Sequence, residues 1–199
     1  MSTSGWSLAH TKTHVQHGVR LYAACLRVQA QCGADILVAD RPSPQELEPA
    51  RLWARTPKVF AALSLLYGAL DRRRSPIEPA LRSLLTVHVS QINWCAFCVD
   101  INSATGMKRG ISEEQFAALE GFETSALFND RQKAALAYAE AMTRTDVGVD
   151  DHLMARLKRH FDDDAVIELT AIIAFQNMSS KFNAALDVAP QGFCRKPPA

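Results

Sequence analysis

Apolar residues recur at spacings of three and four along most of the chain, and strict alternation of apolar and polar positions is almost absent. Spacings of three and four match the period of an amphipathic helix, whereas a half-buried strand alternates with a period of two. One such face is formed by Val59, Phe60, Leu63, Leu66 and Tyr67. The pattern therefore predicts an all-α protein.

Capping residues and prolines divide this pattern into separate helices. Serine, asparagine or aspartate before an apolar run, and proline at the first helical position, are typical helix starts. The starts that we expect are at Ser43-Pro44, Thr56-Pro57, Ser75-Pro76, Ser112, Asn129, Asp150 or Asp151, and Asp162 or Asp163. Ser112 with Gln115 and Asn129 with Gln132 also have the spacing of a capping box.

The proline-containing stretch 39–44 is the best candidate for a boundary, because its composition suits a surface connection. We therefore divide the chain into an N-terminal helical arm (1–45), a core of six or so helices (46–189) and a loose, proline-containing tail (190–199).

With 199 residues, 48% hydrophobic content and a net charge of +1, the chain is expected to form one compact domain. A near-zero charge gives no electrostatic footprint for nucleic acid. The first residues lack the pattern of a signal peptide, and no apolar run is long enough to cross a bilayer. We expect a cytoplasmic protein that binds neither nucleic acid nor membrane.

Cys95 and Cys98 are the strongest candidates for chemistry, because a two-residue gap at a helix start brings both sulfurs within disulfide reach. A helix is predicted to end near Asn93 and a second to begin with one of these cysteines in its first turn. The positive end of the helix dipole favours a thiolate there. Such a cysteine can have its pKa lowered from ~8.5 to between ~3.5 and ~7.5, which makes it a nucleophile at neutral pH.

Two other interpretations of the pair are open. A structural zinc site takes about four ligands, usually from two such pairs, and Cys25, Cys32 and Cys194 form no second pair by spacing. The cysteines could also be small buried apolar residues. We favour redox chemistry, with no metal and no cofactor, in a reducing compartment.

The sequence around these cysteines resembles the alkylhydroperoxidase D-like, or carboxymuconolactone decarboxylase, family. The resemblance spans roughly residues 56–187. It is carried by the stretch Leu84-x-x-Val87-x-x-Ser90-Gln91-x-Asn93-x-Cys95-x-x-Cys98-Val99-Asp100-x-Asn102-Ser103-Ala104, by Gly110-Ile111-Ser112-Glu113-Glu114, and by later helices at 131–140 and 168–183. It implies an AhpD-like helical bundle that assembles into homo-oligomers.

The resemblance also implies a peroxidase mechanism. Cys98 would attack an organic hydroperoxide, Cys95 would resolve the product into a disulfide, and a lipoyl or thioredoxin-type dithiol would reduce that disulfide. A sulfenic acid beside a second thiol condenses in this way. The order of attack stays open, since in thioredoxin-type oxidoreductases the first cysteine is the nucleophile.

The chain departs from the family's proton relay. Where the peroxidases carry a glutamate and two histidines, this sequence has Ser83, Phe97 and Asn102. General acid–base assistance contributes ~10² to 10⁴ in rate, so a peroxidase without it would be slow. Asn102 can still hydrogen-bond a thiolate or orient a water molecule, but it cannot exchange a proton at neutral pH.

Two residues could replace the lost base. His88 lies seven residues before Cys95, two turns back on what should be the same helical face. Asp100 follows Cys98 by two residues, which places it off the Cys98 face, so we expect it to be a cap or an oligomer contact.

His10, His14 and His17 would share one face if their segment is helical. Three imidazoles could hold a divalent metal ion. No carboxylate or cysteine partner is evident nearby, so we expect a solvated face instead.

Three functions are compatible with these residues. The first, which we favour, is a thiol-dependent peroxidase or disulfide oxidoreductase that uses Cys95 and Cys98, with Asn102 and His88 as further candidate site residues. The second is a lyase of the carboxymuconolactone decarboxylase type. The third is a non-catalytic helical oligomer in which the dithiol only senses oxidation.

Overall fold

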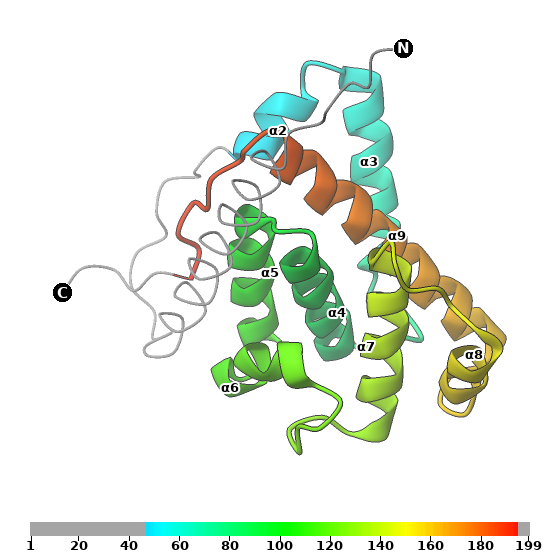
Figure 1. The fold of residues 1–199 in the computed structure, drawn as a ribbon. Coiled ribbons are helices and arrows are strands. Elements are labelled where there is room, and N and C mark those ends of the chain that lie inside the picture. Colours follow the sequence, from blue (N-terminus) through cyan, green and yellow to red (C-terminus); the bar gives the residue numbers. More distant parts are fainter. Residues whose placement is uncertain (1–46, 195–199) are drawn as a thin grey trace, which may run out of the picture.

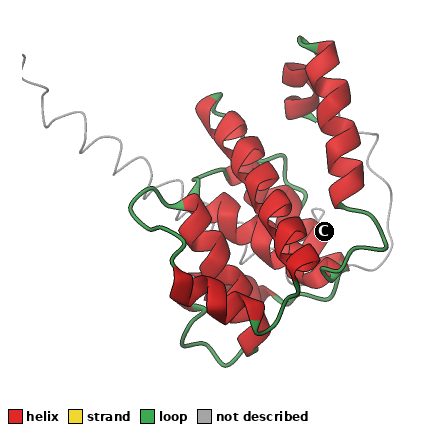
Figure 2. Cartoon of the chain, turned by 90° about the vertical axis from the view of Figure 1, so that its right-hand side faces the viewer, coloured by secondary structure: helices red, strands yellow, loops and turns green. Residues whose placement is uncertain are grey.

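The computed structural model describes residues 47–194 of the chain, so the expected N-terminal arm lies outside the described residues. Within them every regular element is helical (Figure 2), which confirms the all-α prediction for this part. None of these helices combines the length and apolarity needed to cross a bilayer. The elements in Figure 1 are α2 (Glu48–Trp53), α3 (Pro57–Leu70), α4 (Pro79–Ile92), α5 (Ala96–Lys108), α6 (Glu113–Ala117), η1 (Ala118–Gly121), α7 (Asp130–Thr143), α8 (Asp151–Lys158) and α9 (Asp163–Ala185).

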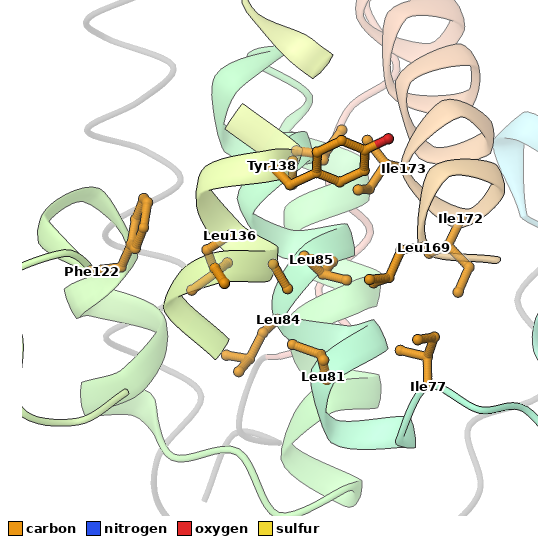
Figure 3. Close-up of a cluster of buried hydrophobic side chains, with 14 of the residues drawn as sticks. Ile77, Leu81, Leu84, Leu85, Phe122, Leu136, Tyr138, Leu169, Ile172 and Ile173 are labelled. Atoms are coloured by element: carbon orange, nitrogen blue, oxygen red, sulfur yellow. The ribbon is translucent and has the colours of Figure 1, made fainter. Parts of the chain in front are cut away.

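Helix α4 is the centre of the bundle, because α5, α7 and α9 all pack against it. Leu84, Leu85 and Val87 on this helix have no exposed surface. Figure 3 shows leucines of α4 meeting Leu136 of α7 and Leu169 of α9 in one apolar cluster. Helix α4 is buried on nearly every side, and its polar residues Arg82, Ser83, His88, Ser90 and Gln91 are buried together with its apolar ones.

The expected caps account for most helix starts. Ser112 with Gln115, and Asn129 with Gln132, form reciprocal capping boxes, which confirms both predictions. The Asp150 and Asp162 carboxylates each accept the N–H three residues ahead, so they cap α8 and α9.

The start of α4 differs from our prediction. The helix begins at Pro79 rather than at Ser75. The Ser75 hydroxyl accepts the N–H of Ile77 and donates to the carboxylate of Glu168, so it holds a turn before the helix and ties it to α9.

The first half of the tail is held in place, which differs from the loose tail that we expected. The Asp100 carboxylate has no exposed surface and accepts the backbone N–H groups of Gly192 (2.7 Å), Phe193 (3.1 Å) and Cys194 (3.0 Å). Asp100 therefore does not cap its own helix, and its carboxylate is enclosed by contacts within the chain. Three N–H groups satisfy a buried carboxylate that would otherwise be costly to desolvate.

Helix α3 contributes no buried residue, and it exposes Val59, Leu65, Leu66 and Tyr67. Apolar side chains left uncovered in one chain are common at contacts between subunits. The single chain does not test the expected homo-oligomer, which stays a prediction.

A glycine lets α5 approach its neighbours closely. A Cβ added to Gly106 would lie 2.6 Å from Cζ of Phe116 and 3.1 Å from Cβ of Ser83. Phe116 and Ser83 are both buried, so neither side chain has free space into which it could move away from an added methyl group.

Gly106→Ala should therefore lower the free energy of unfolding by about 1 to 3 kcal/mol, because the added methyl group overpacks this contact. Gly68→Ala in α3 is the matched control, since a Cβ there meets nothing within 4 Å. It should stabilise the helix by up to about 1 kcal/mol. Urea denaturation of both variants measures the difference, and equal effects would contradict the packing argument.

Candidate active site at the start of α5

A tight turn joins α4 to α5 and sets the position of both cysteines. Trp94 adopts a left-handed backbone conformation (φ 56°), which is unfavourable for a non-glycine residue. The N–H of Cys95 donates to the carbonyl of Ser90 at 3.0 Å. The Asn93 side chain donates to Asn177 (2.8 Å) and Ser180 (2.9 Å) of α9. The surrounding core thus holds the turn in its strained form.

Cys95 is the N-cap of α5, and Cys98 lies in the first helical turn, as predicted. The N–H of Cys98 donates to the Cys95 sulfur at 3.2 Å. No disulfide joins the two residues, and both are almost completely buried. The sulfur of the first cysteine therefore does for α5 what a serine or aspartate oxygen does for other helices.

The pKa of Cys98 is lowered below its ordinary value. The hydrogen bond with Cys95 has the largest effect, and burial opposes it. Hydrogen bonds from Asn183, Ser179 and Gln176 lower the pKa further, and the Asn183 amide lies 3.2 Å from the sulfur. Donors that favour the anion outweigh desolvation, so the environment of Cys98 favours the thiolate form, which is the nucleophile.

The three α9 donors were not among our predicted site residues. Gln176, Ser179 and Asn183 lie at i, i+3 and i+7 on a largely apolar helix, so they share one face. Gln176 and Asn183 are buried. That buried polar stripe is the signal in the sequence that could have identified them.

Cys98 opens onto a cavity of about 370 Å³. Cys95 is not among the lining residues. The walls are mainly aromatic and aliphatic, with side chains from α2, α3, α5 and α9; they include Trp53, Phe60, Leu63, Tyr67, Phe97, Ile101, Phe175 and Met178. Such a cavity suits a small organic molecule with an apolar body.

Asn102 lines the same cavity as Cys98. Its amide lies 3.4 Å from the Ser90 hydroxyl, which also accepts a hydrogen bond from Gln176 at 2.9 Å. The structure therefore brings Asn102 to the site, beside the sulfur's own partners. Its amide contacts Ser90, and within residues 47–194 the structure shows no hydrogen bond between Asn102 and the sulfur of Cys98.

The structure does not bring His88 to the dithiol. The ring packs edge-on against Phe122 (5.3 Å between centroids), and Nε2 lies 4.0 Å from the Glu140 carboxylate of α7. Ser90, which faces the cysteine side, is two residues further along α4 and so points about 200° away. We had placed His88 on the cysteine face; a helix buried all round gives no apolar stripe by which to orient it.

Burial lowers the pKa of His88 to about 4, although Glu140 acts in the opposite direction. In the unfolded chain a histidine titrates near ~6.5. Between about pH 4 and 6.5 this histidine is protonated in the unfolded chain and neutral in the folded one. Its neutral form therefore contributes fully to the unfolding free energy above about pH 6.5, and this contribution is lost as the pH falls toward 4.

The loss should reach about 3 kcal/mol, from a difference of about 2.5 pH units. His88→Leu should remove this part of the pH dependence of the unfolding free energy, measured by denaturant titration from neutral to acidic pH. The exposed His152 provides the control variant, His152→Leu. An unchanged acid slope in His88→Leu would show that the ring does not titrate as its burial implies.

Within residues 47–194, no three histidine, cysteine or acidic side chains gather closely enough to hold a metal ion. His10, His14 and His17 lie outside the described residues, so their arrangement stays a prediction.

Comparison with known sequences places the chain in a family. The model of the carboxymuconolactone decarboxylase family matches residues 57–141. The uncharacterized protein YnjA of Escherichia coli is 44% identical over 151 residues, which cover 76% of this chain and 83% of YnjA. The chain belongs to the carboxymuconolactone decarboxylase family.

Two solved structures are similar in fold. ATU0492 of Agrobacterium tumefaciens, a protein of unknown function described as a candidate antioxidant defence protein AhpD, has a TM-score of 0.65 and 24% identity, over 70% of this chain and 94% of that one. The debrominase Bmp8 has a TM-score of 0.65 and 23% identity, over 73% and 77% of the two chains. At these identities the likeness establishes the AhpD-like helical fold.

Proposed function

We propose that the protein is a dithiol peroxidase that reduces organic hydroperoxides, with Cys98 as the attacking and Cys95 as the resolving cysteine. One observation carries this proposal: the cysteine with the lowered pKa is also the one that lines the apolar cavity, and the other sulfur lies behind it in hydrogen-bond contact. This arrangement supports the order of attack that the resemblance implied.

The reaction begins when the Cys98 thiolate attacks the terminal oxygen of the hydroperoxide. The O–O bond breaks, the sulfur becomes a sulfenic acid, and the leaving alkoxide takes up a proton to become an alcohol. Cys95 then attacks the oxidised sulfur, which forms the disulfide and releases water. An external dithiol of lipoyl or thioredoxin type returns two electrons by thiol–disulfide exchange.

The proton for the leaving alkoxide has to come from a nearby group. Among the described residues that line the cavity, there is no carboxylate and no imidazole. The Cys95 thiol is hydrogen-bonded to the Cys98 sulfur, and losing its proton to the alkoxide would prepare it to attack the sulfenic acid. The hydroxide displaced by that attack then takes a proton from solvent to become water. This route uses one residue for two tasks, so we expect a slower peroxidase than one with a dedicated relay.

A catalytic cycle requires that reduced full-length protein consumes cumene hydroperoxide continuously with dihydrolipoamide as reductant. Cys98→Ser should abolish consumption, and Cys95→Ser should allow at most one turnover, because the sulfenic acid cannot be resolved. Ser64→Ala, on the same cavity wall, is the control and should stay close to wild type. Consumption that persists in Cys98→Ser would contradict the assignment.

The lack of a carboxylate or imidazole in the described cavity lining also favours one alternative function, that of a redox sensor. A dithiol with no titrating relay could respond to oxidants by forming the disulfide without cycling, as a redox sensor. One Cys95–Cys98 disulfide per chain with no continuous consumption would identify this alternative and exclude the peroxidase.

A further inference from the structure

A second, smaller cavity of about 50 Å³ adjoins the first. Five residues line both: Tyr67, Asn102, Thr105, Phe175 and Gln176. A cavity holds one water molecule when its volume reaches ~10 to 15 Å³, so this one has room for a polar group of several atoms. The two cavities therefore lie on either side of these shared side chains, with Cys98 on the wall of the larger.

The small cavity carries excess positive charge. Its lining includes two guanidinium groups, of Arg82 and Arg109, and a single carboxylate, of Asp71. Arg109 binds Asp71 through its Nη2 at 2.9 and 2.8 Å, whereas Nη2 of Arg82 lies 3.5 Å from the same carboxylate. One carboxylate cannot neutralise two guanidinium groups, so a charge of about +1 remains at this end.

Arg82 is the less satisfied of the two arginines. It is 4% exposed, and its Nη1 donates to the carbonyls of Leu70 (3.2 Å) and Arg72 (2.9 Å). Within the described part of the chain, its Nε is buried and has no hydrogen-bond partner. A buried donor without a partner calls for a ligand or an ordered water molecule to satisfy it, and a guanidinium donor favours an anion.

Ser83, which accepts a hydrogen bond from Arg109 Nη1 at 3.3 Å, is small and neutral. A guanidinium matches the planar geometry of a carboxylate, which it can bind through two parallel hydrogen bonds.

We propose that the substrate is an organic hydroperoxide with an apolar body and a carboxylate, which binds between Arg82 and Arg109 while the hydroperoxide group lies at Cys98. This assignment rests on the proposed peroxidase function and names its substrate class. The apolar lining of the large cavity would enclose the body of the molecule.

The test uses full-length protein and a matched pair of substrates, 4-carboxy-cumene hydroperoxide and its methyl ester, which differ in charge and little else. The acid should be reduced with a kcat/KM at least about tenfold above that of the ester, because hydrogen bonds to charged groups are among the stronger polar contacts. In Arg109→Gln this ratio should fall toward one, and Arg109→Lys should restore part of it. A ratio near one in the wild type would overturn the proposal.

Arg156→Gln is the matched control. Arg156 also makes two hydrogen bonds to one carboxylate, that of Glu123, and its side chain is about as exposed as that of Arg109 (25% against 23%). Its loss should leave the acid-to-ester ratio unchanged. Asp71→Asn tests the site by a gain of binding, which misfolding would not produce. Because the competing carboxylate is removed, the acid should bind more tightly. Weaker binding of the acid would count against the site.

A binding measurement separates this proposal from the peroxidase itself. The two alcohols that correspond to the acid and the ester cannot oxidise the protein, and calorimetry measures their binding to Cys98→Ser. Tighter binding of the acid, lost in Arg109→Gln, would support the carboxylate site even if no hydroperoxide were turned over. Turnover of both hydroperoxides with equal binding of both alcohols would retain the peroxidase and overturn the carboxylate site.

Discussion

The hydrogen bond from the Cys98 N–H to the Cys95 sulfur is the contact on which the site depends. It starts α5 inside the protein, fixes the Cys95 sulfur against the first helical turn and leaves Cys98 where the helix dipole favours an anion. The strained turn at Trp94 and the Asn93 contacts to α9 keep this cap in place. Asp100, also on α5, binds the N–H of Phe193. Phe193 and Val188 pack against the two cysteines and cover them.

The chemistry is divided between segments that are far apart in the sequence. The motif supplies the sulfurs, α9 supplies the donors that stabilise the thiolate, and α2 and α3 close the apolar cavity in front of it. The cationic end comes from Arg82 and Arg109, which flank the motif at the far ends of α4 and α5. The proposed substrate, apolar in its body and anionic at one end, matches this distribution of side chains.

Local signals predicted the local features well. The fold class, the capping boxes and the place of Cys98 in the first turn of α5 all depend on residues a few positions apart. Longer-range features were beyond such signals. Asn183 meets Cys98 across 85 residues, and the clasp by Asp100 joins residues more than 90 apart. His88 was misplaced because α4 is buried all round, so its sequence does not show which side faces the dithiol.

The most direct test of the account is to trap the first oxidised sulfur. Reduced Cys95→Ser and Cys98→Ser proteins are each treated with one equivalent of cumene hydroperoxide in the presence of dimedone, and the labelled peptide is identified by mass spectrometry. The account predicts a sulfenic acid adduct on Cys98 in Cys95→Ser and little labelling of Cys95 in Cys98→Ser. Labelling of Cys95 instead would reverse the roles of the two cysteines and contradict the central claim.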